Sequence, residues 1–158
     1  MRDSLMGVVV LAHASGLAGC RGREKTAAQK SLCERLGGEP AVKAVVADFV
    51  GRTAINPKAN FSRKAVDGDA EWKPAPADVE RLKVLLVQFV ASAAGGPQKY
   101  DGRSMKESHK GMKITMTQFN AVANDLAASL DKFKVPAKEK AELLTAVASA
   151  SKDMVEVP

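Results

Sequence analysis

The sequence is poor in cysteine and in aromatic residues. It has two cysteines, Cys20 and Cys33, among 158 residues, which is too few for a disulfide framework to hold the fold. Aromatic residues make up 4% of the chain, whereas hydrophobic residues make up 46% and are mainly Ala and Val. This composition is too apolar for a disordered chain, and it favours packed helices over an aromatic-rich sandwich. We therefore expect one all-α globular domain.

Several function classes lack their signals in this chain. It contains no GxGxxG, GxxxxGK[ST], GxSxG or HExxH motif, so nothing indicates a dinucleotide, P-loop, hydrolase or zinc-protease site. The net charge is +6, from 24 Lys and Arg against 18 Asp and Glu, but no basic run reaches five residues. A mixed charged surface is the simplest interpretation, and we expect no nucleic-acid partner.

The N-terminal stretch MRDSLMGVVVLAHASGLAGC has the layout of a secretory signal. Arg2 gives a charged start, the apolar run from Leu5 to Ala12 is too short to span a bilayer, and small residues follow. Its end, Leu17-Ala18-Gly19-Cys20, closely resembles the lipobox of bacterial lipoproteins. That resemblance implies a signal peptide over residues 1–19 and lipidation of Cys20. The alternatives are a chance match or a misassigned start codon.

If this interpretation holds, residues 20–30 are a tether whose positive charges sit near anionic lipid. The protein is then exported and anchored to a membrane, on the periplasmic or cell-surface side. Cys33 would have no intrachain partner, and we expect it to be a small buried residue.

Capping signals and helical periodicity divide the rest of the chain into predicted helices and loops. Capping boxes begin at Ser31, Ser104 and Thr115, and Gly95-Gly96-Pro97 is a strong stop. We expect two short helices among four longer ones, the last running from Pro136 to about Val155, and a long loop over residues 56–77. The expected core-facing residues of the long helices are Val42, Val45, Val46, Phe49 and Val50; Val79, Leu82, Leu85, Leu86, Phe89 and Val90; Phe119, Val122, Ala123, Leu126 and Leu130; and Leu143, Leu144, Val147 and Met154.

Histidine is scarce, because only His13 and His109 occur and His13 lies in the predicted signal peptide. A lone histidine is usually structural, but His109 lies on a short predicted helix with Met105 one turn before it on the same face. Gly111 lets the backbone turn directly afterwards. One imidazole cannot build a zinc site alone, whereas a haem iron can use a single protein ligand. Without a CxxCH motif, such a haem would not be attached in the c-type manner.

Three stretches resemble the group I truncated haemoglobins over about residues 31 to 155: SLCERLGGEPAVKAVVADF, AAGGPQKYDGRSMKESHKGMKIT and FNAVANDLAASL. The resemblance implies a shortened globin over residues 31–158, in which two antiparallel helix pairs sandwich haem b, with an insertion near 62–77. It implies that His109 is the proximal iron ligand. It also implies a set of haem-contacting residues, which would otherwise be ordinary core: Phe49, Val50, Phe61, Leu82, Leu86 and Phe89, with Met105, Ile114, Phe119 and Val122 on the proximal and inner side.

The chain departs from this family on the distal side. Members usually have Tyr at the position of Val50 and often Gln at that of Leu86, and these polar groups hydrogen-bond bound oxygen. Here both are aliphatic, and Leu82 adds a third apolar side chain. We expect weak, fast-releasing oxygen binding and a relative preference for carbon monoxide and nitric oxide. Trp72, within the insertion, either covers the haem edge or anchors the loop at the surface.

Three functions remain open from the sequence. The first is reversible binding of a diatomic gas (O2, NO or CO) at a five-coordinate haem iron. The second is a haem enzyme, such as a nitric oxide dioxygenase or a peroxidase-like catalyst, which would need an electron-donor protein. The missing polar distal groups argue against this second function. The third is a haem-free helical lipoprotein that binds a partner.

Overall fold

The computed structural model of the chain describes residues 30–62 and 72–157. Within them lie seven helices: α1 (Leu32–Arg35), α2 (Gly38–Ile55), α3 (Pro76–Ala93), α4 (Met105–His109), α5 (Met116–Lys132), α6 (Ala137–Ala148) and α7 (Ser151–Met154). The only β pairing in these residues is one isolated bridge between Thr115 and Val157. The all-α expectation is confirmed. The predicted signal peptide, Cys20 and the centre of the predicted insertion lie outside the described residues.

Local capping explains where the helices begin. Ser31, Ser104 and Thr115 each cap the helix that follows, as the sequence predicts. α3 begins at Pro76, three residues before the start that Asp78 would give as the N-cap. The Asp78 carboxylate instead lies inside the first turn, where it accepts a hydrogen bond from the Ala75 N–H at 3.0 Å. The loop before α3 therefore ends at Ala75, two residues before the predicted end at residue 77.

The expectation of one continuous C-terminal helix to about Val155 is wrong. The Ser149 hydroxyl donates to the Ala146 carbonyl at 2.6 Å, and this carbonyl is the one that the Ala150 N–H would use in a continuing α-helix. The Ala150 N–H donates to the Val147 carbonyl at 3.0 Å instead. The helix tightens here, and α7 starts as a separate turn.

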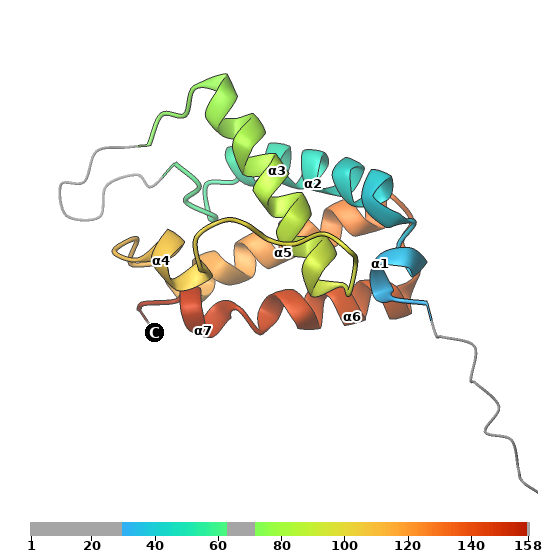
Figure 1. Cartoon of the computed structure of the whole chain (residues 1–158). Coiled ribbons are helices and arrows are strands. Elements are labelled where there is room, and N and C mark those ends of the chain that lie inside the picture. The colour runs from blue at the N-terminus through green and yellow to red at the C-terminus, as the bar shows by residue number, and fades with distance from the viewer. Residues whose placement is uncertain (1–29, 63–71, 158) are drawn as a thin grey trace, which may run out of the picture.

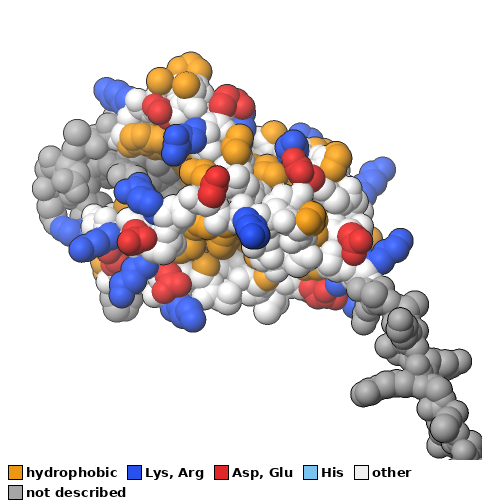
Figure 2. All heavy atoms as spheres, in the orientation of Figure 1, with side chains coloured by type: hydrophobic (Ala, Val, Ile, Leu, Met, Phe, Trp, Pro, Cys, Tyr) orange, Lys and Arg blue, Asp and Glu red, His pale blue; other side chains and the backbone are white. Residues whose placement is uncertain are grey.

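The four long helices form two packed pairs (Figure 1). α2 packs against both α3 and α5, and α6 packs against both α5 and α3. α1 closes one end of this arrangement against α2 and α6, while α4 packs mainly against α7 at the other end. None of the described helices is both long enough and apolar enough to cross a membrane. Figure 2 shows that acidic and basic side chains are interspersed over one face, with apolar side chains between them.

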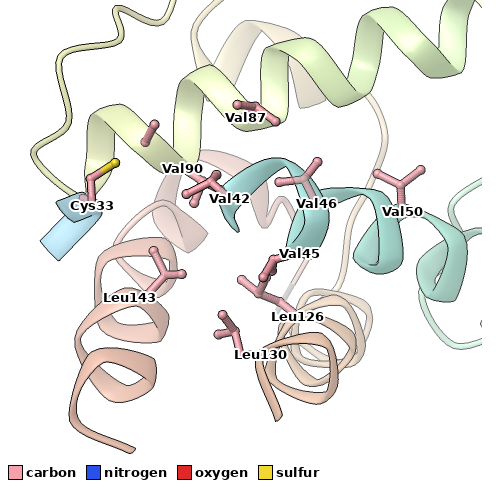
Figure 3. Close-up of a cluster of buried hydrophobic side chains, with 12 residues drawn as sticks. Cys33, Val42, Val45, Val46, Val50, Val87, Val90, Leu126, Leu130 and Leu143 are labelled. Atoms are coloured by element: carbon pink, nitrogen blue, oxygen red, sulfur yellow. The ribbon is translucent and has the colours of Figure 1, made fainter. Parts of the chain in front are cut away.

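The hydrophobic core lies between the helix pairs and consists mainly of valine and leucine side chains. In Figure 3, Val87 and Val90 of α3 face Val42 and Val46 of α2, while Val45 points toward α5. Cys33 is 2% exposed, which confirms the expectation of a small buried residue. Burial, followed by the charges of Glu34 and Glu39, raises the pKa of its thiol. The buried cluster consists of Cys33, Val42, Val45, Val46, Val50, Val87, Val90, Ala91, Ala94, Leu126, Leu130 and Leu143.

Two connections between helices matter for the site. Gly95 has a φ of 71°, which suits glycine, and the chain turns there out of α3. On the other side of the molecule, the Trp72 N–H donates to the Ser62 carbonyl at 2.8 Å, and the Trp72 ring lies 5.5 Å from the Phe61 ring. These contacts hold Trp72, which lies within the predicted insertion, against the residues where that insertion begins.

Candidate haem site

The helix that carries His109 has only five residues, so it depends on contacts beyond its own hydrogen bonds. At its start, the Glu107 N–H donates to the Ser104 hydroxyl oxygen at 3.2 Å, and the Ser104 hydroxyl donates to the Glu107 carboxylate at 2.6 Å. The Tyr100 hydroxyl donates to the Arg103 carbonyl at 2.7 Å, and its ring lies edge-on to Phe89 of α3 at 5.7 Å. These contacts position the start of α4 relative to α3.

The His109 ring is half-buried and its Nδ1 lies 2.7 Å from the Met105 carbonyl oxygen. A carbonyl only accepts, so this geometry assigns the ring proton to Nδ1. Nε2 then carries a free lone pair, and it makes no hydrogen bond with any described residue. An Nδ1–H bonded to a carbonyl is the usual arrangement of an imidazole that binds a metal through Nε2.

Within the described part of the chain, His109 does not belong to a cluster of metal-binding side chains. The described residues contain no group of three or more His, Cys, Asp or Glu side chains that could hold a metal ion. A single ligand suits a cofactor that supplies the remaining ligands itself, as the four porphyrin nitrogens of haem do. The donor set therefore fits haem iron and does not fit a metal site made of protein ligands alone.

The predicted haem-contacting residues lie on several elements. Phe49 and Val50 are on α2, Leu82, Leu86 and Phe89 on α3, Met105 on α4, and Phe119 and Val122 on α5, with Phe61 after α2 and Ile114 before α5. Val50 and Phe119 are buried, and the other eight are only half-buried. Their partial burial leaves apolar surface that a ligand could contact.

Five of these residues lie in the hydrophobic core or against it. Val50 belongs to the buried core, and Phe49, Phe61, Leu86 and Phe89 pack against that core. These five residues are therefore core residues and candidate haem neighbours at once, whereas Leu82 is not among the residues packed against the core. Leu82 and Leu86 are one turn apart on α3, so they share a face. The roles of the ten individual residues stay predictions.

One polar residue near the distal set was not singled out from the sequence. Thr53 is 3% exposed, and its hydroxyl oxygen has no hydrogen-bond partner. It follows Phe49 by four residues and Val50 by three, so it lies on the same stripe of α2 one turn further on. The spacing is visible in the sequence, but the expected apolar stripe ends at Val50, and a threonine one turn later does not by itself indicate a buried hydroxyl.

A second missed residue lies on the proximal side. The Glu156 carboxylate accepts from the Gly111 N–H at 2.8 Å and from the Lys113 N–H at 2.7 Å, just after His109. These two backbone donors hold the pKa of Glu156 below its usual value. No local signal in the sequence could have found this contact, because more than 40 residues separate its partners.

Comparisons with known proteins show which family the chain resembles. Residues 31–156 match the family model of the bacterial-like globins. The chain is 34% identical over 126 residues to the group 1 truncated haemoglobin GlbN of Mycolicibacterium paratuberculosis, covering 80% of this chain and 85% of the relative. It is 29% identical over 126 residues to the group 1 truncated haemoglobin of Tetrahymena pyriformis, covering 80% of this chain and 95% of the relative.

Solved structures show the same fold. The truncated haemoglobin of Tetrahymena pyriformis in its Fe(III) form superposes with a TM-score of 0.68 at 28% identity, covering 80% of this chain and 98% of that one. The 2/2 haemoglobin of Synechococcus gives a TM-score of 0.62 at 27% identity, covering 79% of this chain and 95% of that one. The fold and the single-imidazole site thus define a globin with two helix pairs packed on each other.

The chain belongs to the bacterial-like globin family, and within it to the truncated globins. The family confirms haem b, with iron, as the cofactor, and the lone pair on His109 Nε2 fits it. The expected truncated-globin fold is confirmed as well.

Proposed function

We propose that this globin binds a diatomic gas reversibly at a five-coordinate haem iron, held by His109 and faced by an apolar distal pocket. The observation that carries the proposal is the 2.7 Å contact between His109 Nδ1 and the Met105 carbonyl, which leaves Nε2 available. Bound haem supplies an iron atom with one open position for the gas. The helix α4 holds the imidazole, and the half-buried apolar side chains provide the surface that the porphyrin covers.

The aliphatic distal side chains set the expected ligand preference. Val50, Leu82 and Leu86 have no hydrogen-bond donor, so they cannot stabilise the partial negative charge on bound oxygen. A hydrogen bond to a charged or strongly polarised group is worth about 1.5–3 kcal/mol. Its absence weakens oxygen binding by about tenfold to a hundredfold, at 1.4 kcal/mol per factor of ten. Carbon monoxide and nitric oxide depend less on this hydrogen bond.

An absorption spectrum of the reduced protein, with and without carbon monoxide, tests the proposal. We expect a Soret band that shifts on adding carbon monoxide and is lost in His109→Ala. Lys110→Ala, an exposed neighbour on the same turn, is the matched control and should keep the band. Colourless protein after expression with ample haem would contradict the proposal and favour a haem-free binding role.

An enzymatic role for the same haem has less support. Nitric oxide dioxygenase or peroxidase-like chemistry uses polar distal groups to stabilise bound oxygen or peroxide, and Val50, Leu82 and Leu86 supply none. It would also require an electron-donor protein. Turnover of nitric oxide in the presence of a reductase, at a rate above that of oxygen release, would favour the enzyme over the gas carrier.

We also propose that the protein is an exported lipoprotein anchored through Cys20. The support is the sequence Leu17-Ala18-Gly19-Cys20 after a short apolar run. Incorporation of labelled palmitate and recovery in the membrane fraction should both be lost in Cys20→Ser. Cys33→Ser removes the other cysteine and should leave both unchanged. Labelling that survives Cys20→Ser would contradict the anchor.

A further inference from the structure

The C-terminal tail folds back onto the turn that follows His109. The Ile114 carbonyl accepts from the Glu156 N–H at 3.0 Å and from the Val157 N–H at 3.2 Å. The two oxygens of the Glu156 carboxylate accept from Gly111 and Lys113, one backbone N–H each, at 2.8 and 2.7 Å. Four hydrogen bonds from two tail residues therefore hold one short connector between α4 and α5.

The connector itself has a conformation that needs support. Gly111 has a φ of 78° and Lys113 a φ of 49°, so both lie in the left-handed region. Lys113 is not a glycine, and such a conformation is unfavourable for it unless the surroundings hold it. Turns of this kind point their N–H groups toward one place and form a concave anion site. In this chain the anion is the side chain of Glu156.

Glu156 also contacts the backbone just beyond the C-terminal end of α4. Tyr100 and Ser104 fix the start of this five-residue helix, whereas its end runs directly into the turn at Gly111. α4 packs mainly against α7, and Val155, the C-terminal cap of α7, immediately precedes Glu156. The tail thus connects the packing of α4 to the backbone two residues beyond His109.

We propose that Glu156 is a positioning residue for the iron ligand, fixing the direction and depth of the His109 ring through the turn at residues 110–114. This inference rests on the proposed function, in which His109 binds the haem iron. Partners that orient a metal ligand without touching the metal commonly change metal affinity when they are removed. Glu156 would act in this way through the backbone of the turn.

The test compares Glu156→Ala and Glu156→Gln with the wild-type, haem-loaded chain. Three quantities are measured: the iron–histidine stretching band by resonance Raman, the rate of haem transfer to an excess of a haem-accepting apoprotein, and the amide resonances of Gly111 and Lys113 by NMR. We expect Glu156→Ala to keep its Soret band, to shift or broaden the Raman band, and to lose haem about tenfold faster, as is typical for an orienting partner. Glu156→Gln should be intermediate, because its side chain offers only one acceptor oxygen to the two amides.

The control is Glu142→Gln, which removes a carboxylate paired with Arg35 away from α4. It should leave the Raman band and the haem-transfer rate unchanged. An unchanged Raman band and an unchanged transfer rate in both Glu156 variants would overturn the inference. If Glu156→Ala fails to fold, Glu156→Gln decides by the same two readouts. A Soret band that survives His109→Ala would instead overturn the proposed function, whatever the Glu156 variants do.

Discussion

At the scale of single residues, the proposed function places Val50 on the distal side of the haem. It is 3% exposed and carries no polar atom, so it gives bound oxygen no donor. We expect Val50→Tyr to slow oxygen release by about tenfold or more, since a hydrogen bond of 1.5–3 kcal/mol then becomes available. The measurement is stopped-flow displacement of oxygen by carbon monoxide.

The control for this variant is Val50→Phe. It adds the same ring to a well-packed place and so carries the same cost of overpacking, but it has no hydroxyl. Equal release rates in the two variants would show that ring size, and not hydrogen bonding, governs the distal side.

Thr53 offers a second prediction at the residue scale. Its hydroxyl is buried without a partner, and an unpaired buried hydroxyl costs about 1–3 kcal/mol. Thr53→Val keeps the shape and removes the polar atom, so it should raise the free energy of unfolding by about 1 kcal/mol. Urea denaturation measures this change. Thr53→Ser, which keeps the hydroxyl, should not be stabilised, and a destabilised valine variant would mean that the hydroxyl has a partner.

At the scale of elements, α4 should depend strongly on its cap. Ser104→Ala removes the hydroxyl that caps the helix, a change that costs about 1 kcal/mol. We expect faster hydrogen exchange of the α4 amides and faster haem loss, because the contacts of Tyr100 then hold the start of this short helix without the cap. Ser31→Ala removes an equivalent cap on α1, at the other end of the fold. It should leave haem loss unchanged, and equal haem loss in both variants would contradict a local role for Ser104.

The elements also show what the sequence could and could not predict. Ser31, Ser104 and Thr115 were recognisable as caps because a capping box lies within four consecutive residues. The break before α7 was not recognisable: the Ala150 N–H there donates to the Val147 carbonyl, while the Ala146 carbonyl accepts from the Ser149 hydroxyl. The apolar spacing of α6 does not reveal this change in hydrogen bonding.

The candidate site also has one part that the sequence could predict and one that it could not. His109 could be predicted because it is the one histidine outside the N-terminal segment and because its surroundings resemble a known family. The contact of Glu156 with the next turn could not, because it depends on how the tail returns across the fold. Spacing along a helix is readable in a sequence, whereas a meeting of distant segments requires the packed structure.

At the scale of the whole molecule, Asp48 joins α2 to α5. Its carboxylate accepts from Lys132, from Arg52 Nε at 2.6 Å and from the Ser129 hydroxyl at 2.8 Å. These hydrogen bonds, with Lys132 the largest contributor, hold the pKa of Asp48 far below its usual value. A carboxyl with a lowered folded pKa stabilises the protein above its unfolded pKa, about 3.9, and loses that contribution as the pH falls toward the folded pKa.

Asp48→Asn should therefore lower the melting temperature at neutral pH, and the difference from wild type should shrink as the pH falls below about 4. Thermal unfolding of the two proteins over this pH range measures it. Glu80→Gln, which breaks an exposed pair with Lys83 within α3, is the control and should have little effect. A difference that stays constant from pH 7 to below pH 4 would contradict the role assigned to the Asp48 charge.

The hydrogen bond from Trp72 to Ser62, backed by the contact of the Trp72 and Phe61 rings, has a consequence for the design of variants. Ser62 and Trp72 lie next to each other at this point, so a change of chain length between them need not move α2 or α3. The entropy of closing such a segment grows only slowly with its length. This junction is therefore a suitable insertion point, where a fluorescent reporter or an affinity tag could be placed while α2 and α3 keep their positions.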